Sequence, residues 1–407
     1  MWDACGFFPK EGIEVLILMS LIKVEDDHVL RMHDQLRDLG REIVREENQQ
    51  EPQNRSRLWD YEEVQRVLNH NKGTGKIEGI NLSNRPGRIY AEKQFKNLTS
   101  LRFLQLDWWA HLSGDFKDLM EELKWLQWQH CPANFEVNNF CVKELAVLDL
   151  QGSYINEKWG GWSFFKMAKK LKYLDLSYCR RLENTDFLSA FEKLEVLILG
   201  GCTALKRIDA SIEDTEGLLC LEPCSSYALH LAGGADAGAE RPFLVSPWEL
   251  PAEIGKLKSL RQLDLSSTPS LSALPNSIGS LENLEILDIS SSGIEELPNG
   301  IGSLRKLREL RASNCEDLKW ILVEIMANLS SLRRLDFIYC DKLQSLPELP
   351  SGLTDLRVTC QSRKLPSLSH LAHLKELVVH GCDNLQRHPG ASINAIKEFK
   401  MLPTDGH

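Results

Sequence analysis

The sequence contains no long hydrophobic run. Its most apolar early segment, Gly12 to Ile22, includes Glu14. An α-helix needs roughly 20 apolar residues to cross a bilayer, and this segment is far shorter. No signal peptide is visible either, so we expect no membrane partner and interpret the segment as a buried helix.

An excess of positive charge is also missing. The chain has 48 Lys and Arg residues against 58 Asp and Glu residues, a formal net charge of -10. Proteins that bind a nucleic-acid backbone need a basic surface to neutralise phosphates. The charge balance therefore disfavours nucleic acid and favours a protein as the partner.

No motif of an active site is present. The segment Gly73-Thr74-Gly75-Lys76 is not a complete phosphate-binding loop, which needs a glycine five residues before the Gly-Lys pair and Ser or Thr after it. His70 and Ile77 occupy those positions. The pair His33-Asp34 has no nucleophile nearby, and we interpret His370, His373, His380 and His388 as solvated side chains of different repeats. We expect no enzymatic activity, no catalytic residue and no metal site.

A leucine ladder is what the chain does contain. The pattern L-x-x-L-x-L occurs twelve times, at intervals of 21 to 26 residues within two blocks. The copies begin at Ile77, Leu101, Leu123, Leu145, Leu171, Leu194, Leu260, Leu284, Leu307, Leu332, Leu353 and Leu374. This is the leucine-rich-repeat pattern, in which each copy supplies one strand and buries its apolar face only against its neighbours. We predict an α/β fold, a curved solenoid with parallel strands on its concave face.

The cysteines follow the same ladder. Six of the 11 cysteines stand three residues after the third ladder position: Cys131, Cys179, Cys202, Cys315, Cys340 and Cys382. Such residues predict buried, reduced side chains within the repeats rather than disulfides.

The repeats do not cover the whole chain. We expect a separate unit at 1–76, a first block of repeats at 77–210, a degenerate repeat with a mobile Gly/Ala-rich insertion at 211–247, a second block at 248–390 and a tail at 391–407.

Hydrophobic spacing predicts the elements of the first unit. They are a buried helix at Val15–Ile22, a strand pair formed by Val24 and Val29–Met32, an amphipathic helix at Asp34–Glu46 and a short helix at Glu62–Leu68.

Aromatic and arginine side chains at positions expected to face outward are the candidates for protein binding, because these residue types are enriched at interface hot spots. They are Arg102, Phe103, Trp108, Trp125, Tyr173, Tyr178, Arg311, Arg333 and Tyr339. An alternative for Trp108 and Trp125 is that they cover the junction with the first unit.

Three segments resemble one family in their order and spacing. They are Cys5-Gly6-Phe7-Phe8-Pro9 with the helix after it, Leu30 to Arg45 with its Met32-His33-Asp34, and Arg55-Ser56-Arg57-Leu58-Trp59 followed by Ile77-Glu78-Gly79-Ile80. With the ladder, they make nearly the whole chain similar to plant intracellular nucleotide-binding leucine-rich-repeat immune receptors of the TIR-type class.

The resemblance implies that 1–76 is the winged-helix end of a nucleotide switch domain. It also implies that His33, flanked by Met32 and Asp34, contacts the β-phosphate of ADP in the resting state. The TIR domain, the phosphate-binding loop and most of the nucleotide pocket would precede residue 1. One histidine cannot hold ADP alone, so we expect weak or no nucleotide binding by this chain, which would be a fragment, a truncated product or an incomplete gene model.

The function implied by the resemblance is that of an immune sensor in the cytoplasm or nucleus. Its repeats would recognise a pathogen effector or a guarded host protein in the defence response, and would contact the nucleotide-binding domain of the same chain to keep it inactive. A stand-alone repeat scaffold or decoy without nucleotide switching is the alternative, with the first unit capping the solenoid.

Overall fold

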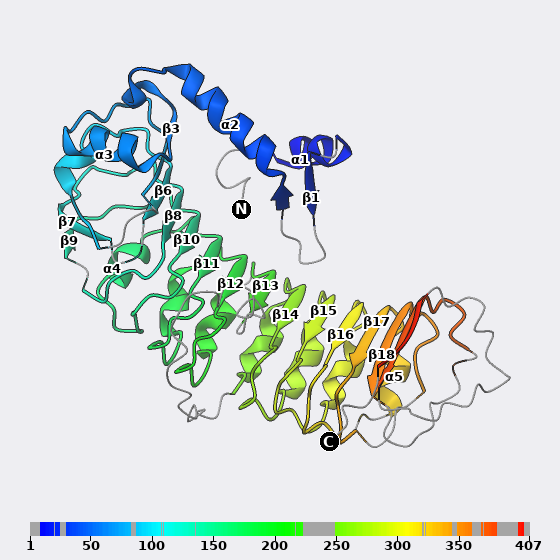
Figure 1. The fold of residues 1–407 in the computed structure, drawn as a ribbon. Coiled ribbons are helices and arrows are strands. Elements are labelled where there is room, and N and C mark those ends of the chain that lie inside the picture. The colour runs from blue at the N-terminus through cyan, green and yellow to red at the C-terminus, as the bar shows by residue number, and fades with distance from the viewer. Residues whose placement is uncertain are drawn as a thin grey trace. The chain divides into compact units, whose positions relative to one another are not determined.

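The computed structural model describes residues 9–19, 21–24, 30–82, 87–106, 108, 110–134, 136–215, 217–222, 249–319, 321, 323–343, 348–359, 368, 370–380 and 398–402. The chain divides into two units, Met1–Asp175 and Leu176–His407. Figure 1 labels the elements of both. Within the described ranges no helix is long and apolar enough to span a membrane.

The first unit begins with a helix and a strand pair, but the helix starts and ends earlier than predicted, and Ile22 belongs to the first strand. Helix α1 spans Pro9–Leu18, and strands β1 (Ile22–Val24) and β2 (Leu30–Met32) pair antiparallel. The expectation that the helix is buried was wrong, because Leu18 is 84% exposed. The small β1–β2 hairpin is the element that α1 contacts, and a hairpin of three-residue strands cannot cover a helix face.

Helix α2 (Asp34–Glu47) lies where the sequence places it, but its apolar side is mostly exposed. Of the four predicted apolar residues, only Val44 is buried, whereas Leu39 and Ile43 are each 57% exposed. The helix is amphipathic, as predicted, and the described part of the chain leaves most of its apolar side uncovered.

A compact cap precedes the repeats. It consists of a 3-10 helix, η2 (Pro52–Asn54), strand β3 (Arg57–Leu58) and helix α3 (Tyr61–Asn69). Asp60 caps α3 by accepting a hydrogen bond from the Glu63 amide, and Val64 and Leu68 are fully buried. Strand β3 pairs with the first repeat strand and so covers the open end of the ladder.

Parallel strands form the main sheet of the first unit in the order β3-β4-β6-β8-β10-β11. The repeat strands are β4 (Gly79–Asn81), β6 (Phe103–Leu106), β8 (Trp125–Trp128), β10 (Val147–Asp149) and β11 (Tyr173–Asp175). Ladder residues such as Leu104, Leu126 and Leu148 face the core with at most 1% exposure, and the residues between them face away. We call the surface made by the latter residues the outer face.

Phenylalanine rings fill the opposite side of this unit. The ring centroids of Phe95, Phe116 and Phe140 are 5.7 and 5.8 Å apart in succession, and Phe165 follows at 6.1 Å. Around them lie a second parallel sheet and short helices: β5 (Ile89–Ala91), β7 (His111–Asp115), β9 (Val137–Asn138), η3 (Glu92–Gln94) and α4 (Trp162–Phe165).

The second unit repeats the same plan. Its strands follow one another in sequence order: β12 (Val196–Ile198), β13 (Cys220–Glu222), β14 (Gln262–Asp264), β15 (Ile286–Asp288), β16 (Glu309–Arg311), β17 (Arg334–Phe337), β18 (Asp355–Thr359), β19 (Glu376–His380) and β20 (Glu398–Leu402). Each of the twelve predicted ladder copies therefore contains a strand. The predicted degenerate repeat contributes β13, whereas the Gly/Ala-rich insertion lies outside the described residues.

Short helices stand opposite the strands of the second unit. They are η4 (Asp186–Ala190), η5 (Ala210–Asp214), η7 (Ala252–Lys256), η8 (Asn276–Ser280), η9 (Asn299–Ser303) and α5 (Val323–Asn328). Pro251, Pro275 and Pro298 precede η7, η8 and η9 as their N-caps, a position where the missing amide of proline costs no hydrogen bond.

The described ladder cysteines are buried and reduced, as predicted. The Sγ atoms of Cys202, Cys315 and Cys340 donate hydrogen bonds to Leu176, Ile289 and Ala312, with Sγ–O distances of 3.2, 3.0 and 2.9 Å. Each thiol therefore satisfies a strand carbonyl of the preceding repeat. Cys360 and Cys382 lie outside the described residues.

The close approach of η8 and η9 at their glycines can be tested by substitution. A Cβ atom at Gly279 would stand 2.3 Å from the Gly300 carbonyl oxygen, which is backbone and cannot rotate away. We expect Gly279→Ala to lower the free energy of unfolding by about 1–3 kcal/mol. The midpoint of urea unfolding, followed by circular dichroism, measures this loss.

Gly217→Ala is the matched control in the same unit, because its nearest neighbour would be the Leu194 oxygen at 3.6 Å. It should leave the midpoint nearly unchanged. Equal midpoints for the two variants would contradict the close approach of η8 and η9.

Candidate protein-binding surface

Aromatic side chains occupy one row of the outer face of the first unit. The strand register places Phe103, Trp125, Val147 and Tyr173 side by side in successive repeats. The Phe103 and Trp125 rings lie 6.4 Å apart, tilted by 52°. We call Phe103, Trp125 and Tyr173 the aromatic row, and all three side chains are half-buried. The structure thus brings together three of the predicted binding residues.

A polar network lies beside the aromatic row. The Asp149 carboxylate accepts hydrogen bonds from the side-chain amides of Gln127 at 2.8 Å and Gln129 at 3.3 Å. Burial raises the pKa of Asp149, and hydrogen bonds from the Gln151 backbone and the two glutamines offset part of that rise. These donors and acceptors are held in fixed directions next to the aromatic rings, an arrangement suited to specific recognition.

Sequence reasoning missed this network. Gln127 and Asp149 stand at the variable position between the last two ladder residues, so the ladder spacing was a sufficient signal that their side chains face outward.

Charged side chains dominate the outer face of the second unit. The register aligns Asp264, Asp288, Arg311, Asp336 and Arg357 in five successive strands. Arg311 lies 2.6 Å from Glu309 and 3.7 Å from Asp288. We call these five residues the charged row, of which only Arg311 was among the predicted binding residues.

Arg311 keeps its charge within this row. Its burial alone would lower the pKa, but the hydrogen bond to Glu309 and the charges of Glu309, Asp288 and Asp264 outweigh burial and raise it. Arg334, beside it, lies 3.6 Å from the same Glu309. A ligand would therefore meet an ordered set of charges of both signs, which favours specificity over raw affinity.

The aspartates of these rows also shape the backbone. Asp149, Asp264, Asp288 and Asp336 each accept a hydrogen bond from the amide two residues further on, at 2.9 to 3.0 Å. This is an Asx-turn, which ends the strand and starts the return.

Three predicted binding residues lie in turns rather than in strands, which corrects their expected placement. Trp108, Tyr178 and Tyr339 each stand two residues after the third ladder position. Tyr178 and Tyr339 have φ values of +60°, and the Tyr178 amide donates to the Gly200 oxygen of the next repeat. A left-handed residue is needed here because the chain must turn away from the sheet while its amide still pairs with the next repeat.

These turn residues stack along one edge of each sheet. Trp108 is 52% exposed and its ring lies 4.3 Å from that of His130, while Tyr339 lies 4.6 Å from His380. Arg102 and Arg333 lie at the opposite edge, each immediately before a strand, where their amides donate to Glu78 and Arg308. The predicted residues therefore occupy the outer face and both of its edges.

The segment Met32-His33-Asp34 lies at the junction of β2 and α2. His33 is the N-cap of α2, and its Nδ1 accepts a hydrogen bond from the Gln35 amide at 3.3 Å. In the neutral ring the proton is then on Nε2, which remains a donor suited to a phosphate oxygen. Met32 is 50% exposed, and Asp34 pairs with Arg37 at 2.9 Å.

These residues fit one phosphate contact but not a complete nucleotide site. The N-terminus of α2 favours an anion, whereas the Asp34 carboxylate in its first turn opposes one. The part of the chain that the structure describes adds no lysine or second amide cradle beside His33. The role of His33, Met32 and Asp34 in nucleotide contact stays a prediction.

The histidines do not form a metal site in the described part of the chain, where no group of three metal-ligating side chains occurs. His388 lies outside the described residues.

Comparison with known proteins gives two family matches. Residues 1–48 match the family model "Disease resistance protein Roq1-like, winged-helix domain", and residues 247–403 match "Leucine-rich repeat region".

Several disease resistance proteins of Arabidopsis thaliana are similar to nearly the whole chain. RRS1 is 28% identical over 99% of this chain and 33% of its own length, and RPP2A is 32% identical over 86% and 23%. RPS6 is 28% identical over 92% of this chain and 36% of its own. The chain thus spans about a quarter to a third of the length of these relatives.

Among solved structures, the leucine-rich repeat domain of the type III effector XopL is similar to this chain. The match covers 54% of this chain and 72% of that domain, at a TM-score of 0.42 and 24% identity.

The charged row generates a prediction about pH. Burial, followed by the charge of Asp288, raises the pKa of Asp264 to about 6. The native state then binds a proton more tightly than the unfolded state, whose aspartate titrates near 3.9. Stability is lost as the pH rises through this interval, so at pH 7.5 Asp264→Asn should raise the free energy of unfolding, on the order of 1 kcal/mol after allowance for solvent screening.

The gain should vanish below about pH 3, where the carboxyl is protonated in both states. Urea unfolding of the variant and the parent at both pH values measures it. Asp317→Asn is the control, because the hydrogen bond from Lys342, at 2.7 Å, lowers the pKa of Asp317, so its replacement should not gain stability. A variant at position 264 no more stable than the parent at pH 7.5 would refute the pKa assignment.

Proposed function

The chain is related to the TIR-type disease resistance proteins of plants, and from this relationship we propose that it is the recognition part of an immune receptor. Its ligand is a protein, a pathogen effector or a host protein that effectors modify. The aromatic row is the observation that carries the proposal. Three half-buried rings project from three of four successive repeats, with Val147 between Trp125 and Tyr173, and the exposed parts of the rings can bury large areas against a partner.

The charged row adds selectivity to this surface. Arg311 is held by Glu309 and Asp288, and Arg357 by Glu376 at 2.8 Å. A ligand must present charges that complement this order, since burying an unmatched charge costs several kcal/mol. Aromatic anchors supply affinity and the ordered charges reject unsuitable partners.

The first unit supports a switch function in the complete receptor. His33 offers an Nε2–H donor at the start of α2, the position expected to contact the β-phosphate of ADP. Loss of this contact would release the winged helix from the resting arrangement and favour the active state. The repeats contact the nucleotide-binding domain in the resting receptor and act from the cytoplasm or nucleus, and the chain itself catalyses no reaction.

A repeat scaffold or decoy is the second candidate. The cap formed by β3 and α3 closes the apolar end of the ladder by itself, so the repeats do not require a switch domain for their stability. Reading the full-length transcript separates the two candidates, because a receptor transcript encodes the nucleotide-binding domain upstream of residue 1.

Removing one ring of the aromatic row tests ligand recognition. Trp125→Ala in a complete receptor should abolish cell death induced by the cognate effector and weaken ligand binding at least about thirtyfold, since a central interface tryptophan contributes about 2 kcal/mol or more. Effector-induced cell death in leaves and co-precipitation of the ligand measure the two effects.

Ile89→Ala is the control, because Ile89 is a 65% exposed hydrophobic residue of β5, outside the main sheet. It should leave both responses intact. Full recognition by the Trp125 variant would remove the aromatic row from the binding surface.

A second prediction concerns His33. His33→Val in a complete receptor should cause cell death without an effector, because it removes the phosphate donor. It also removes the N-cap of α2, so His33→Asp is the companion variant: aspartate retains a cap acceptor but repels phosphate. Both should be active, and quiescence of both, at normal protein levels, would rule out the switch role.

A further inference from the structure

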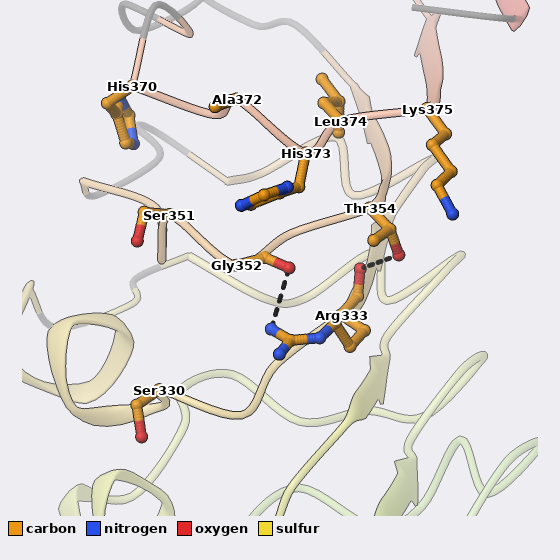
Figure 2. Close-up of a pocket in the computed structure, with 10 residues that line it drawn as sticks. All are labelled: Ser330, Arg333, Ser351, Gly352, Thr354, His370, Ala372, His373, Leu374 and Lys375. Carbon is orange, nitrogen blue, oxygen red and sulfur yellow. Dashed lines mark hydrogen bonds between the residues drawn. The ribbon is translucent and has the colours of Figure 1, made fainter.

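A basic pocket lies at the edge of the second unit where β17, β18 and β19 begin. The cavity is about 680 Å³ and is lined by residues of three successive repeats. They are Ser330 and Arg333 before β17, Ser351, Gly352 and Thr354 before β18, and His370, Ala372, His373, Leu374 and Lys375 before β19 (Figure 2). Four of these side chains are basic or can become so, three carry hydroxyls, and none of them is acidic.

Two cations of the pocket have no carboxylate partner among the described residues. Arg333 and Lys375 form no ion pair there, although neighbouring arginines of the same sheet do. Arg308, one repeat before Arg333 at the same position, lies 3.2 Å from Glu285. In a chain of net charge -10, cations without acids in a hollow indicate a site for an external anion.

Backbone groups hold Arg333 in place without neutralising it. Its Nη1 donates to the Gly352 oxygen at 3.0 Å and to the Leu332 oxygen at 3.3 Å. A Cβ atom at position 352 would stand 2.2 Å from that Nη1, so glycine is the residue that admits the guanidinium. The guanidinium charge of Arg333 is thus held against the Gly352 carbonyl of the next repeat, as Figure 2 shows.

The remaining groups suit an oxyanion. A ring nitrogen of His370 lies 2.9 Å from the Leu349 oxygen, which fixes the ring at one side of the pocket. In Figure 2 the His373 ring points toward Ser351 above Gly352, and Lys375 extends on the other side of Thr354. Imidazole, ammonium and guanidinium groups, which can all donate hydrogen bonds to an oxyanion, line the same cavity.

The surrounding sequence is basic as well. Residues 356–375 contain Arg357, Arg363, Lys364, Lys375 and two histidines but no Asp or Glu, although the chain has 58 acidic residues.

We propose that this basic pocket binds a phosphate monoester. A phosphate group carries up to two negative charges and accepts hydrogen bonds on three oxygens, which matches a site with the held cation Arg333, the cation Lys375, two histidines and two serine hydroxyls. The cavity volume is in the range of sites for small ligands, so the phosphate comes with a small molecule or with a phosphorylated side chain. The site is separate from the outer face and does not depend on its role in protein recognition.

Calorimetric titration of the 407-residue chain at low ionic strength tests the proposal. Glucose 6-phosphate and a phosphoserine peptide should bind saturably with one site, whereas glucose and the unphosphorylated peptide should not. Binding of both phosphorylated probes, or of either one, supports the site, and their relative affinities identify the source of the phosphate.

Charge-neutralising variants locate the binding. Arg333→Gln and Lys375→Gln should each weaken it at least about tenfold, the effect of losing a charged hydrogen bond. Arg308→Gln, at the same repeat position but outside the pocket and paired with Glu285, should bind like the parent. Since Arg333 also bonds two carbonyls, the Lys375 variant serves if the Arg333 variant unfolds. Absence of saturable binding, or equal losses in the Lys375 and Arg308 variants, overturns the proposal.

Discussion

Backbone pairing between successive strands is the constraint on which the rest of the repeats depends. Each strand is only three to five residues long and buries its leucines against the strands before and after it. Because Leu263, Leu287 and Leu310 are aligned in register, the residues between them are aligned as well. The aromatic row and the charged row are therefore consequences of core packing. The binding surface consists of side chains that face away from the core. The buried leucines fix the strand register and thereby align these side chains.

The ladder spacing was enough to predict a strand in each of the twelve copies, but it missed β20, which continues the sheet within the segment predicted as a tail. It also identified Phe103, Trp125, Tyr173 and Arg311 as outward-facing. It failed for Trp108, Tyr178 and Tyr339, because the strand ends earlier than simple alternation suggests. What ends it is an Asx-turn, which is local, and a left-handed residue whose amide pairs with the next repeat. The latter partner is not visible in a local pattern.

The helices of the first unit show a different limit. Their positions followed from apolar periodicity, and α3 is buried as predicted. For α1 and α2 the same periodicity predicted burial that the described residues do not provide, since Leu18, Leu39 and Ile43 remain exposed. Periodicity reports which face of a helix is apolar, but not which surface covers it. The basic pocket escaped sequence analysis for a related reason: Arg333, Gly352 and Lys375 are far apart along the chain and meet only through the stacking of repeats.

Alternate residues of each strand have different roles, in the core or on the outer face, and this separation affects how such a protein evolves. In β6, β8, β10 and β11 the central leucine is the same, while the residue before it is Phe, Trp, Val or Tyr. The fold accepts all four, although Val147 is buried and the three aromatic side chains are half-buried. New specificities can therefore arise by single substitutions with small effects on folding, and selection can act on recognition and on stability almost independently.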